Sequence, residues 1–113
     1  MKANFTESHS FFFLQGFLVD GLAVDSVSQN LYWTDPERDR IEISRLDGSS
    51  RRVLISSGFD DPRAIAVDPI RGWIYWSDWG SKARIERAWG DGNHKEAIIT
   101  TVKKRQMRSK INA

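Results

Sequence analysis

The sequence predicts an all-β protein made of two consecutive four-stranded antiparallel blades of a β-propeller. Three observations lead to this fold class: a repeat with a period in the low forties, short strand-like pieces separated by turn residues, and strands that are apolar on both faces. A repeat of this length built from short strands is typical of propeller blades rather than of helical repeats.

The repeat aligns GLAVDSVSQNLYWTD at residues 21–35 with AIAVDPIRGWIYWSD at residues 64–78, at an offset of 43. One inserted residue then shifts the offset to 44, at which Arg-Ile-Glu and Asp-Gly recur further along each unit. We therefore expect one blade at residues 21–63 and the next at residues 64–101. Residues 1–20 form an N-terminal segment that loosely resembles the end of a preceding blade.

Each unit divides into four strand-length pieces separated by turn residues, which predicts a four-stranded meander. The first unit has them at residues 22–25, 31–34, 40–46 and 52–55, and in the second unit they begin at residues 65, 74, 84 and 95. Asp47-Gly48 and Asp91-Gly92 are the strongest hairpin signals. Because glycine accepts a positive φ, we expect primed turns there.

The strands are apolar on both faces, as expected for blades that stack side by side. Side chains alternate along a strand, so Leu31 and Trp33 should point one way and Tyr32 the other. The same alternation applies to Tyr75 and Trp76. We expect Trp33 and Trp76 to be core residues.

Composition narrows the function classes. The chain is 40% hydrophobic and 28% charged, which argues against disorder, and it has no cysteine, which excludes a disulfide framework, a thiolate metal site and a cysteine nucleophile. The apolar run at residues 11–19 is too short to span a bilayer and makes a poor signal peptide.

Residues 102–113 contain five basic and no acidic residues. Since no aromatic is interleaved there, we expect a solvated, disordered tail and no nucleic-acid partner.

Several motifs together resemble the class B repeats of the low-density lipoprotein receptor-related proteins. They are YWTD at 32–35, RLDG at 45–48, PRAIAVDP at 62–69 and YWSD with DWG at 75–80. The resemblance covers roughly residues 21–101. It implies two blades of a six-bladed YWTD wheel, an incomplete ring, next to EGF-like modules in a parent receptor. Both ends of the chain depart from the family pattern, so the chain looks truncated or aberrantly spliced.

The resemblance also implies a function. Wheels of this family bind protein ligands at the cell surface, in endocytosis or signalling, without a cofactor and without enzymatic activity. One rim of the meander should carry a mixed-charge surface around an aromatic residue. The resemblance places Glu37, Arg63 and Trp79 on the ligand-facing rim. For Arg63 and Trp79 the alternative is packing against the next blade.

The acidic residues have competing interpretations. Asp35 and Asp78 are candidate metal or acid-base carboxylates, but each ends a strand a few residues before Arg40 or Arg84, so we expect a structural pairing. Asp25 and Asp68 border the axial channel, where propeller hydrolases hold Ca²⁺. Two blades offer too few ligands for calcium, so turn capping is favoured and no metal site is predicted.

Three residues outside the repeat motifs remain. Asn4 begins the glycosylation sequon Asn-Phe-Thr, which matters if the chain is secreted. His9 and His94 are interpreted as surface residues rather than as a pH switch.

Three functions therefore compete. The leading hypothesis is a protein-binding piece of a receptor ectodomain. The second is a propeller hydrolase with axial calcium. The third is a truncated product without autonomous function, whose exposed blade faces would cause oligomers or aggregation.

Overall fold

The computed structural model describes residues 19–100, and every regular element in this range is a β-strand. The first sheet contains β1 (Leu22–Asp25), β2 (Asn30–Asp35), β3 (Arg40–Arg45) and β4 (Arg52–Ile55). The second contains β5 (Pro62–Asp68), β6 (Trp73–Asp78), β7 (Arg84–Trp89) and β8 (Glu96–Ile99). Each sheet is an antiparallel meander in sequence order. We call the two sheets blade 1 and blade 2.

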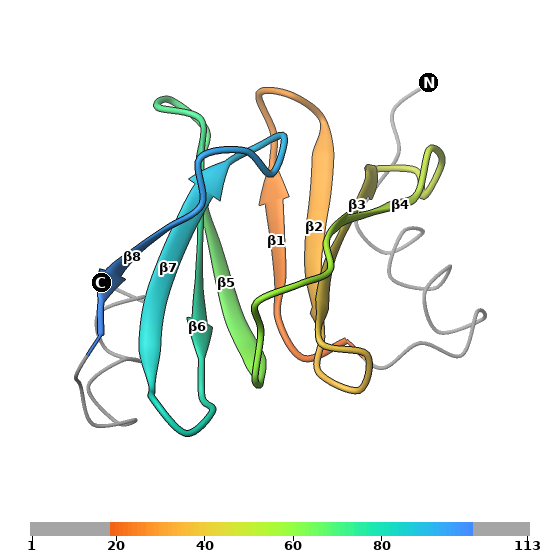
Figure 1. Ribbon diagram of the computed structural model, residues 1–113. Helices are drawn as coiled ribbons and strands as arrows, with labels where there is room; N and C mark the ends of the chain where they lie inside the picture. Colours follow the sequence, from red (N-terminus) through yellow and green to blue (C-terminus); the bar gives the residue numbers. More distant parts are fainter. Residues whose placement is uncertain (1–18, 101–113) are drawn as a thin grey trace.

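The blades lie side by side, with β1 and β5 as neighbours in the middle and β4 and β8 outermost (Figure 1). The all-β prediction and the two four-stranded meanders are confirmed. The sequence-predicted division between residues 63 and 64 falls inside β5. The N-terminal segment up to residue 18, with Asn4 and His9, and the basic tail lie outside the described residues. Within residues 19–100, no helix is long and apolar enough to cross a bilayer.

One hydrophobic core fills the space between the blades. Blade 1 contributes Tyr32 and the isoleucines of β3 and β4, and blade 2 contributes Ile65, Ile74 and Trp76. Trp76 is fully buried, and the ring of Phe59 meets it edge to face at 5.8 Å between centroids. Leu31 and Trp33 are also fully buried, on the opposite face of β2. The motif therefore sends alternate side chains to the two faces of the blade.

Two side-chain hydroxyls link the blades through backbone carbonyls. Tyr32 Oη donates to the carbonyl oxygen of Gly90 at 3.0 Å, and Thr34 Oγ1 donates to that of Arg63 at 2.5 Å. Because blade 1 comes so close here, a side chain at Gly21 would collide with the Arg63 carbonyl. The contact between the blades is thus both apolar and directionally fixed.

The primed-turn prediction for the Asp-Gly hairpins is wrong. In the first hairpin the Gly48 N–H donates to the Arg45 carbonyl at 2.9 Å, and the Arg45 N–H donates to the Ser49 carbonyl at 2.8 Å. Gly48 has φ of 86°, whereas Asp47 does not have a positive φ. This pattern is a type I turn followed by a glycine bulge, a three-residue loop. The second hairpin repeats it with Gly92.

Candidate functional site

The rim that carries the predicted ligand-facing residues is held together by Asp78. Its carboxylate accepts the backbone N–H groups of Asp60, Asp61 and Gly80 at 2.8–3.2 Å. The Trp79 N–H in turn donates to the Asp61 carbonyl at 2.9 Å. The link between the blades and the loop between β6 and β7 are thereby pinned to each other, which fixes Trp79 in position.

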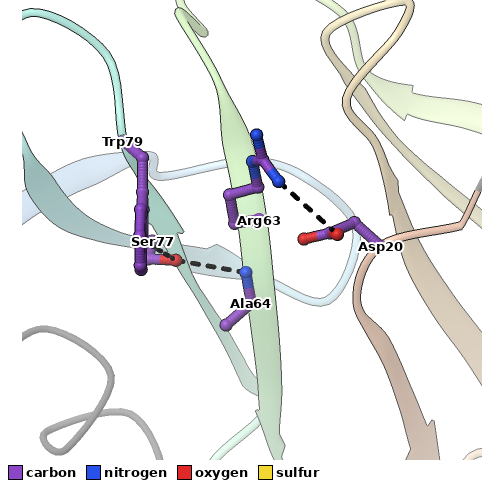
Figure 2. A pocket seen from close by; sticks show the side chains of 5 residues that line it. All are labelled: Asp20, Arg63, Ala64, Ser77 and Trp79. Carbon is purple, nitrogen blue, oxygen red and sulfur yellow. Dashed lines mark hydrogen bonds and ion pairs between the residues drawn. The ribbon is translucent and has the colours of Figure 1, made fainter. Parts of the chain in front are cut away.

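Arg63 and Trp79 line one small pocket of about 180 Å³ (Figure 2). Its other lining residues are Asp20, Ala64 and Ser77. Ser77 Oγ accepts hydrogen bonds from Trp79 Nε1 and from the Ala64 backbone N–H, both at 3.1 Å. The indole is therefore anchored at its polar edge.

The Arg63 guanidinium is oriented by two carboxylates. Its Nε donates to Asp61 Oδ1 at 3.0 Å, and its Nη1 lies 3.7 Å from Asp20 Oδ1. The hydrogen bond to Asp61 and the nearby negative charges raise the pKa of Arg63 above its ordinary value. The side chain still exposes 43% of its surface. An exposed, pre-oriented guanidinium beside an indole suits the recognition of another protein, since Arg and Trp are common interface anchors.

Glu37 is not part of this pocket. It lies in the loop between β2 and β3 of blade 1, where its backbone N–H donates to Asp35 Oδ1 at 3.1 Å and its side chain is exposed. The structure thus brings two of the three predicted rim residues together and leaves Glu37 apart.

The two motif aspartates each accept N–H groups of the loop that follows them. Asp35 accepts the N–H groups of Glu37 and Arg38 and pairs with the Arg38 guanidinium at 3.1 Å, while Arg40 is 3.9 Å away. Asp35 therefore closes its own loop. Asp78 also holds the segment that enters its blade, and the corresponding segment before blade 1 lies outside residues 19–100. In both cases the carboxylate is buried and surrounded by donors, which is a structural arrangement.

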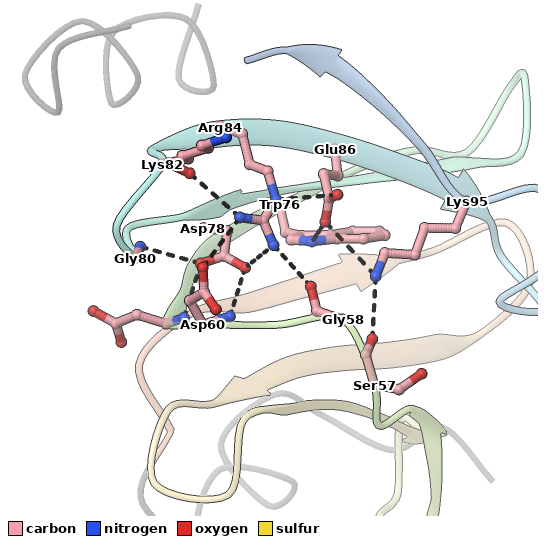
Figure 3. A network of polar contacts seen from close by, with 11 residues as sticks. Ser57, Gly58, Asp60, Trp76, Asp78, Gly80, Lys82, Arg84, Glu86 and Lys95 are labelled. Carbon is pink, nitrogen blue, oxygen red and sulfur yellow. Dashed lines mark hydrogen bonds and ion pairs between the residues drawn. The ribbon is translucent and has the colours of Figure 1, made fainter. Parts of the chain in front are cut away.

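Arg84 pairs with Asp78 and lies at the centre of a polar network (Figure 3). Its guanidinium contacts Asp78 at 2.9 Å, Glu86 at 3.2 Å and the Gly58 carbonyl at 2.7 Å. Glu86 also accepts from Trp76 Nε1 at 3.2 Å. Burial by itself lowers the pKa of Arg84, but the charges of Asp78 and Glu86 outweigh it and raise this pKa. The network ties the buried tryptophan to the link between the blades.

The carboxylates at the ends of the inner strands accept hydrogen bonds from the turns that directly follow them. Asp25 Oδ1 accepts the N–H groups of Val27 and Ser28, and Asp68 Oδ1 accepts that of Arg71. Within residues 19–100 no group of three or more acidic or histidine side chains is placed to hold a metal ion. His94 stacks on Trp89 with 3.4 Å between ring centroids.

Sequence reasoning missed three of the pocket residues: Asp20, Ala64 and Ser77. Asp20 belongs to the N-terminal segment in the sequence-based division. Ser77 is part of the YWSD motif, which was interpreted as structural. The signal for Ser77 was its position next to Trp79, two residues along the chain, where a hydroxyl can accept the indole N–H.

Comparisons with known proteins agree with these features. Residues 29–69 match the model of the low-density lipoprotein receptor repeat class B. The chain is 57% identical over 61 residues to low-density lipoprotein receptor-related protein 5 of Mus musculus, an alignment that covers 54% of this chain and 4% of that protein. A chain in the crystal structure of a nidogen/laminin complex superposes with a TM-score of 0.69 and 40% identity, covering 71% of this chain and 31% of that one. The chain thus spans a small part of these relatives.

Proposed function

Because the chain carries repeats of the low-density lipoprotein receptor class B type, folded as two blades of a YWTD propeller, we propose that it is a protein-binding piece of a receptor ectodomain. The receptor would act at the cell surface in endocytosis or signalling, with EGF-like modules and further blades as neighbours. Asn4 would be glycosylated there. Its protein ligand would meet the rim that carries Arg63 and Trp79.

The observation that carries this proposal is the pocket shared by Arg63 and Trp79. Its two side chains are held in place before any ligand arrives, by Asp61 and Ser77 respectively. A side chain that is already ordered loses less conformational entropy on binding, and this saving favours affinity. Glu37 would then contribute a separate, peripheral contact on blade 1, with a smaller effect on affinity.

The chemistry supports binding rather than catalysis. The carboxylates of the strand ends all accept hydrogen bonds from backbone N–H groups or pair with arginines. These residues are Asp25, Asp35, Asp68 and Asp78. We infer a non-enzymatic role that needs no cofactor. Calorimetry with Ca²⁺ checks this against the hydrolase alternative: we expect no stoichiometric binding heat, and tight binding of one calcium ion would favour the hydrolase.

A binding screen tests the site. Candidate partners are secreted proteins, including nidogen and laminin, the two proteins named for the similar structure, measured by biolayer interferometry against the immobilised chain. We expect Arg63→Ala and Trp79→Ala each to weaken a positive interaction at least about tenfold, which corresponds to about 1.4 kcal/mol. The matched control is Ile70→Ala, an 85% exposed residue in the turn at the opposite rim.

Two outcomes contradict the proposal. If every partner binds the Arg63→Ala and Trp79→Ala variants as tightly as the unchanged chain, the pocket is not the ligand site. If no secreted protein binds the chain at all, the product without autonomous function becomes the better account.

A further inference from the structure

Blade 2 contains two overlapping pairs of tryptophans. Residues 73–79 read WIYWSDW, so Trp73 and Trp76 are each followed three positions later by another tryptophan. None of the other tryptophans of the chain has a tryptophan at that position. The corresponding residues 30–36 of blade 1 read NLYWTDP and contain a single tryptophan. The pairs are therefore a property of blade 2 and not of the repeat.

This spacing has a chemical meaning in the secretory pathway. Most glycosylation joins a sugar to nitrogen or oxygen, but one class of lumenal glycosyltransferase joins a hexose to carbon, at C2 of an indole ring. Such enzymes read two tryptophans three positions apart in an unfolded chain and modify the first of them. Trp73 and Trp76 are the two acceptors that this rule allows. Trp79 is not an acceptor, because Lys82 stands three positions after it.

The fold excludes one of the two acceptors. Trp76 points into the core between the blades and is fully buried. Its Nε1 donates to Glu86 at 3.2 Å (Figure 3). C2 is bonded directly to this nitrogen, so a hexose on C2 would displace Glu86 and bury sugar hydroxyl groups among apolar side chains, which is costly. A sugar on Trp76 is thus incompatible with the folded chain.

Trp73 lies on the opposite face of β6, because residues three apart in a strand point to opposite faces. It is partly exposed. Within residues 19–100 its indole N–H has no hydrogen-bond acceptor, whereas the indole N–H groups of Trp76 and Trp79 both have one. A buried indole N–H usually has a partner, so we expect the N–H of Trp73 to face solvent. C2 lies beside this nitrogen and is open in the same way.

The ring of Trp73 is held by contacts that do not involve this edge. The Arg87 guanidinium lies over the ring, 3.8 Å from its centroid. Trp89 lies beside it with 6.4 Å between centroids, and His94 stacks on Trp89. Glu96 pairs with Arg87. Since Arg87 contacts the face of the ring, a sugar attached at the edge leaves this contact intact.

We propose that Trp73 carries a hexose joined through the C2 carbon of its indole. The donor is a hexose linked to a polyprenyl phosphate. C2 bonds to the anomeric carbon of the hexose while the bond from that carbon to the phosphate oxygen breaks. The polyprenyl phosphate leaves with the electron pair, and the proton of C2 passes to a base of the transferase, which restores the aromatic ring. This inference rests on the proposed place of the chain in a receptor ectodomain, because the donor acts in the secretory pathway.

The sugar stays clear of the pocket formed by Arg63 and Trp79. Trp73 pairs with Asp68, at the rim opposite this pocket. Ser77, which lines the pocket, is four residues farther along β6, about 13 Å away along the strand. A sugar is bulky and solubilising, so it would cover the exposed aromatic end of blade 2 without touching the ligand site.

Mass spectrometry tests the proposal. The full chain, preceded by a cleavable secretion signal, is produced in mammalian cells, recovered from medium and cells, and digested with trypsin. Residues 72–82 form one tryptic peptide that contains Trp73, Trp76 and Trp79. We expect this peptide to gain the mass of one hexose, with fragment ions that place it on Trp73. A carbon–carbon bond survives fragmentation that strips O-linked sugars, so the same spectra distinguish a sugar on Tyr75 or Ser77.

Two matched variants test the spacing. Trp76→Phe removes the second tryptophan of the Trp73 pair and should abolish the modification. Trp79→Phe removes the second tryptophan of the Trp76 pair and should leave the sugar on Trp73. Because the transferase acts on the unfolded chain, a variant that folds poorly still reports on the spacing when the cell fraction is analysed.

The added signal delivers the chain to the lumen, so an unmodified Trp73 overturns the inference whatever the ligand screen shows. A hexose found on Trp76 in place of Trp73 overturns it as well, and so does a Trp73 sugar that persists in Trp76→Phe. If Trp73 is modified and no secreted protein binds the chain, the inference stands and the proposed ligand site does not. The two proposals can therefore fail separately.

Discussion

Arg84 Nη2 lies 2.9 Å from Asp78 Oδ2, at the point where the link between the blades enters blade 2. Asp78 is completely buried and Arg84 exposes 17% of its side chain. The pair also meets the backbone of the link, through the N–H groups of Asp60 and Asp61 and the carbonyl of Gly58. The ion pair thus fixes the link at the point where it enters blade 2.

Replacing Asp78 with Asn should destabilise the chain by about 3 kcal/mol, because the change removes the nearest of the negative charges that surround a largely buried guanidinium, and with it the carboxylate that accepts the backbone N–H groups of the link. Urea unfolding followed by circular dichroism measures the loss. The matched control is Asp68→Asn, whose partner Arg71 is 75% exposed, and its expected cost is much smaller because water screens the pair. Equal costs for the two changes would show that the Asp78 pair is not structural.

Replacing Trp76 with Phe should cost about 2–4 kcal/mol, since the smaller ring leaves a cavity between the blades and removes the indole donor to Glu86. Trp89→Phe, at a 41% exposed site, should cost less than about 1 kcal/mol. Thermal and urea unfolding compare the two. A Trp76→Phe variant as stable as the unchanged chain would rule out Trp76 as a central core residue.

Tyr32 gives a prediction about alkaline pH. Burial, followed by the negative charge of Asp25, raises the pKa of Tyr32 above its ordinary value of 10.0. The folded chain therefore holds the phenol proton more tightly than the unfolded chain. The contribution of Tyr32 to the free energy of unfolding is fully present below pH 10 and declines as the pH rises above it. We expect the free energy of unfolding to fall in that range in the unchanged chain.

Tyr32→Phe should remove this component of the alkaline decline and cost about 1 kcal/mol at neutral pH, because the hydroxyl contact with Gly90 is lost. Tyr75→Phe should leave the decline in place. The measurement is a series of urea titrations from pH 7 to pH 11. An identical alkaline profile in Tyr32→Phe would contradict the assignment to this residue.

Asp39 gives the opposite kind of substitution, one that stabilises. Burial and the neighbouring carboxylates of Asp61 and Asp78 raise the pKa of Asp39 above its ordinary value of 3.8. The residue also has φ of 52°, which asparagine tolerates well. The folded chain thus disfavours the ionised carboxylate. The protonated form of Asp39 contributes to stability at low pH, and this contribution is lost as the pH rises above 3.8.

Asp39→Asn should therefore stabilise the chain at pH 7 by less than about 1 kcal/mol, and this gain should shrink toward pH 3, where Asp39 is protonated. Urea titrations at both pH values give the difference. Glu37→Gln, a nearby exposed charge outside the acidic cluster, serves as the control. A gain that is larger at pH 3 than at pH 7 would have the wrong sign for this account.

Local patterns predicted most of the fold. The strands at Leu22–Asp25 and Arg52–Ile55 have the expected bounds, because apolar periodicity and flanking turn residues act over a few residues. β5 begins at Pro62, three residues earlier than expected, since Pro62 pairs with Asp78 across an irregularity in the register. The turn type of the Asp-Gly hairpins was also missed. Both errors concern how a strand is joined to or paired with its neighbour. The sequence of a single strand does not specify this.

The candidate site was harder to predict for the same reason. Asp78 accepts N–H groups of the link between the blades from residues that lie 18 and 17 positions earlier in the chain. Asp20 reaches Arg63 across the boundary between the blades, a contact 43 residues apart in sequence. Glu37 and Trp79 follow matching motifs in different blades, and the structure leaves them apart. Tertiary packing decides these distances.

The packing of the two blades is tested most directly by a nuclear Overhauser effect between the Tyr32 ring protons and the Hα protons of Gly90. The phenol oxygen lies 3.0 Å from the Gly90 carbonyl although the two residues are 58 positions apart. We predict a clear cross-peak in the folded chain. Cross-peaks from the Tyr32 ring that stay within blade 1, with none to Gly90 or Ile74, would contradict the account.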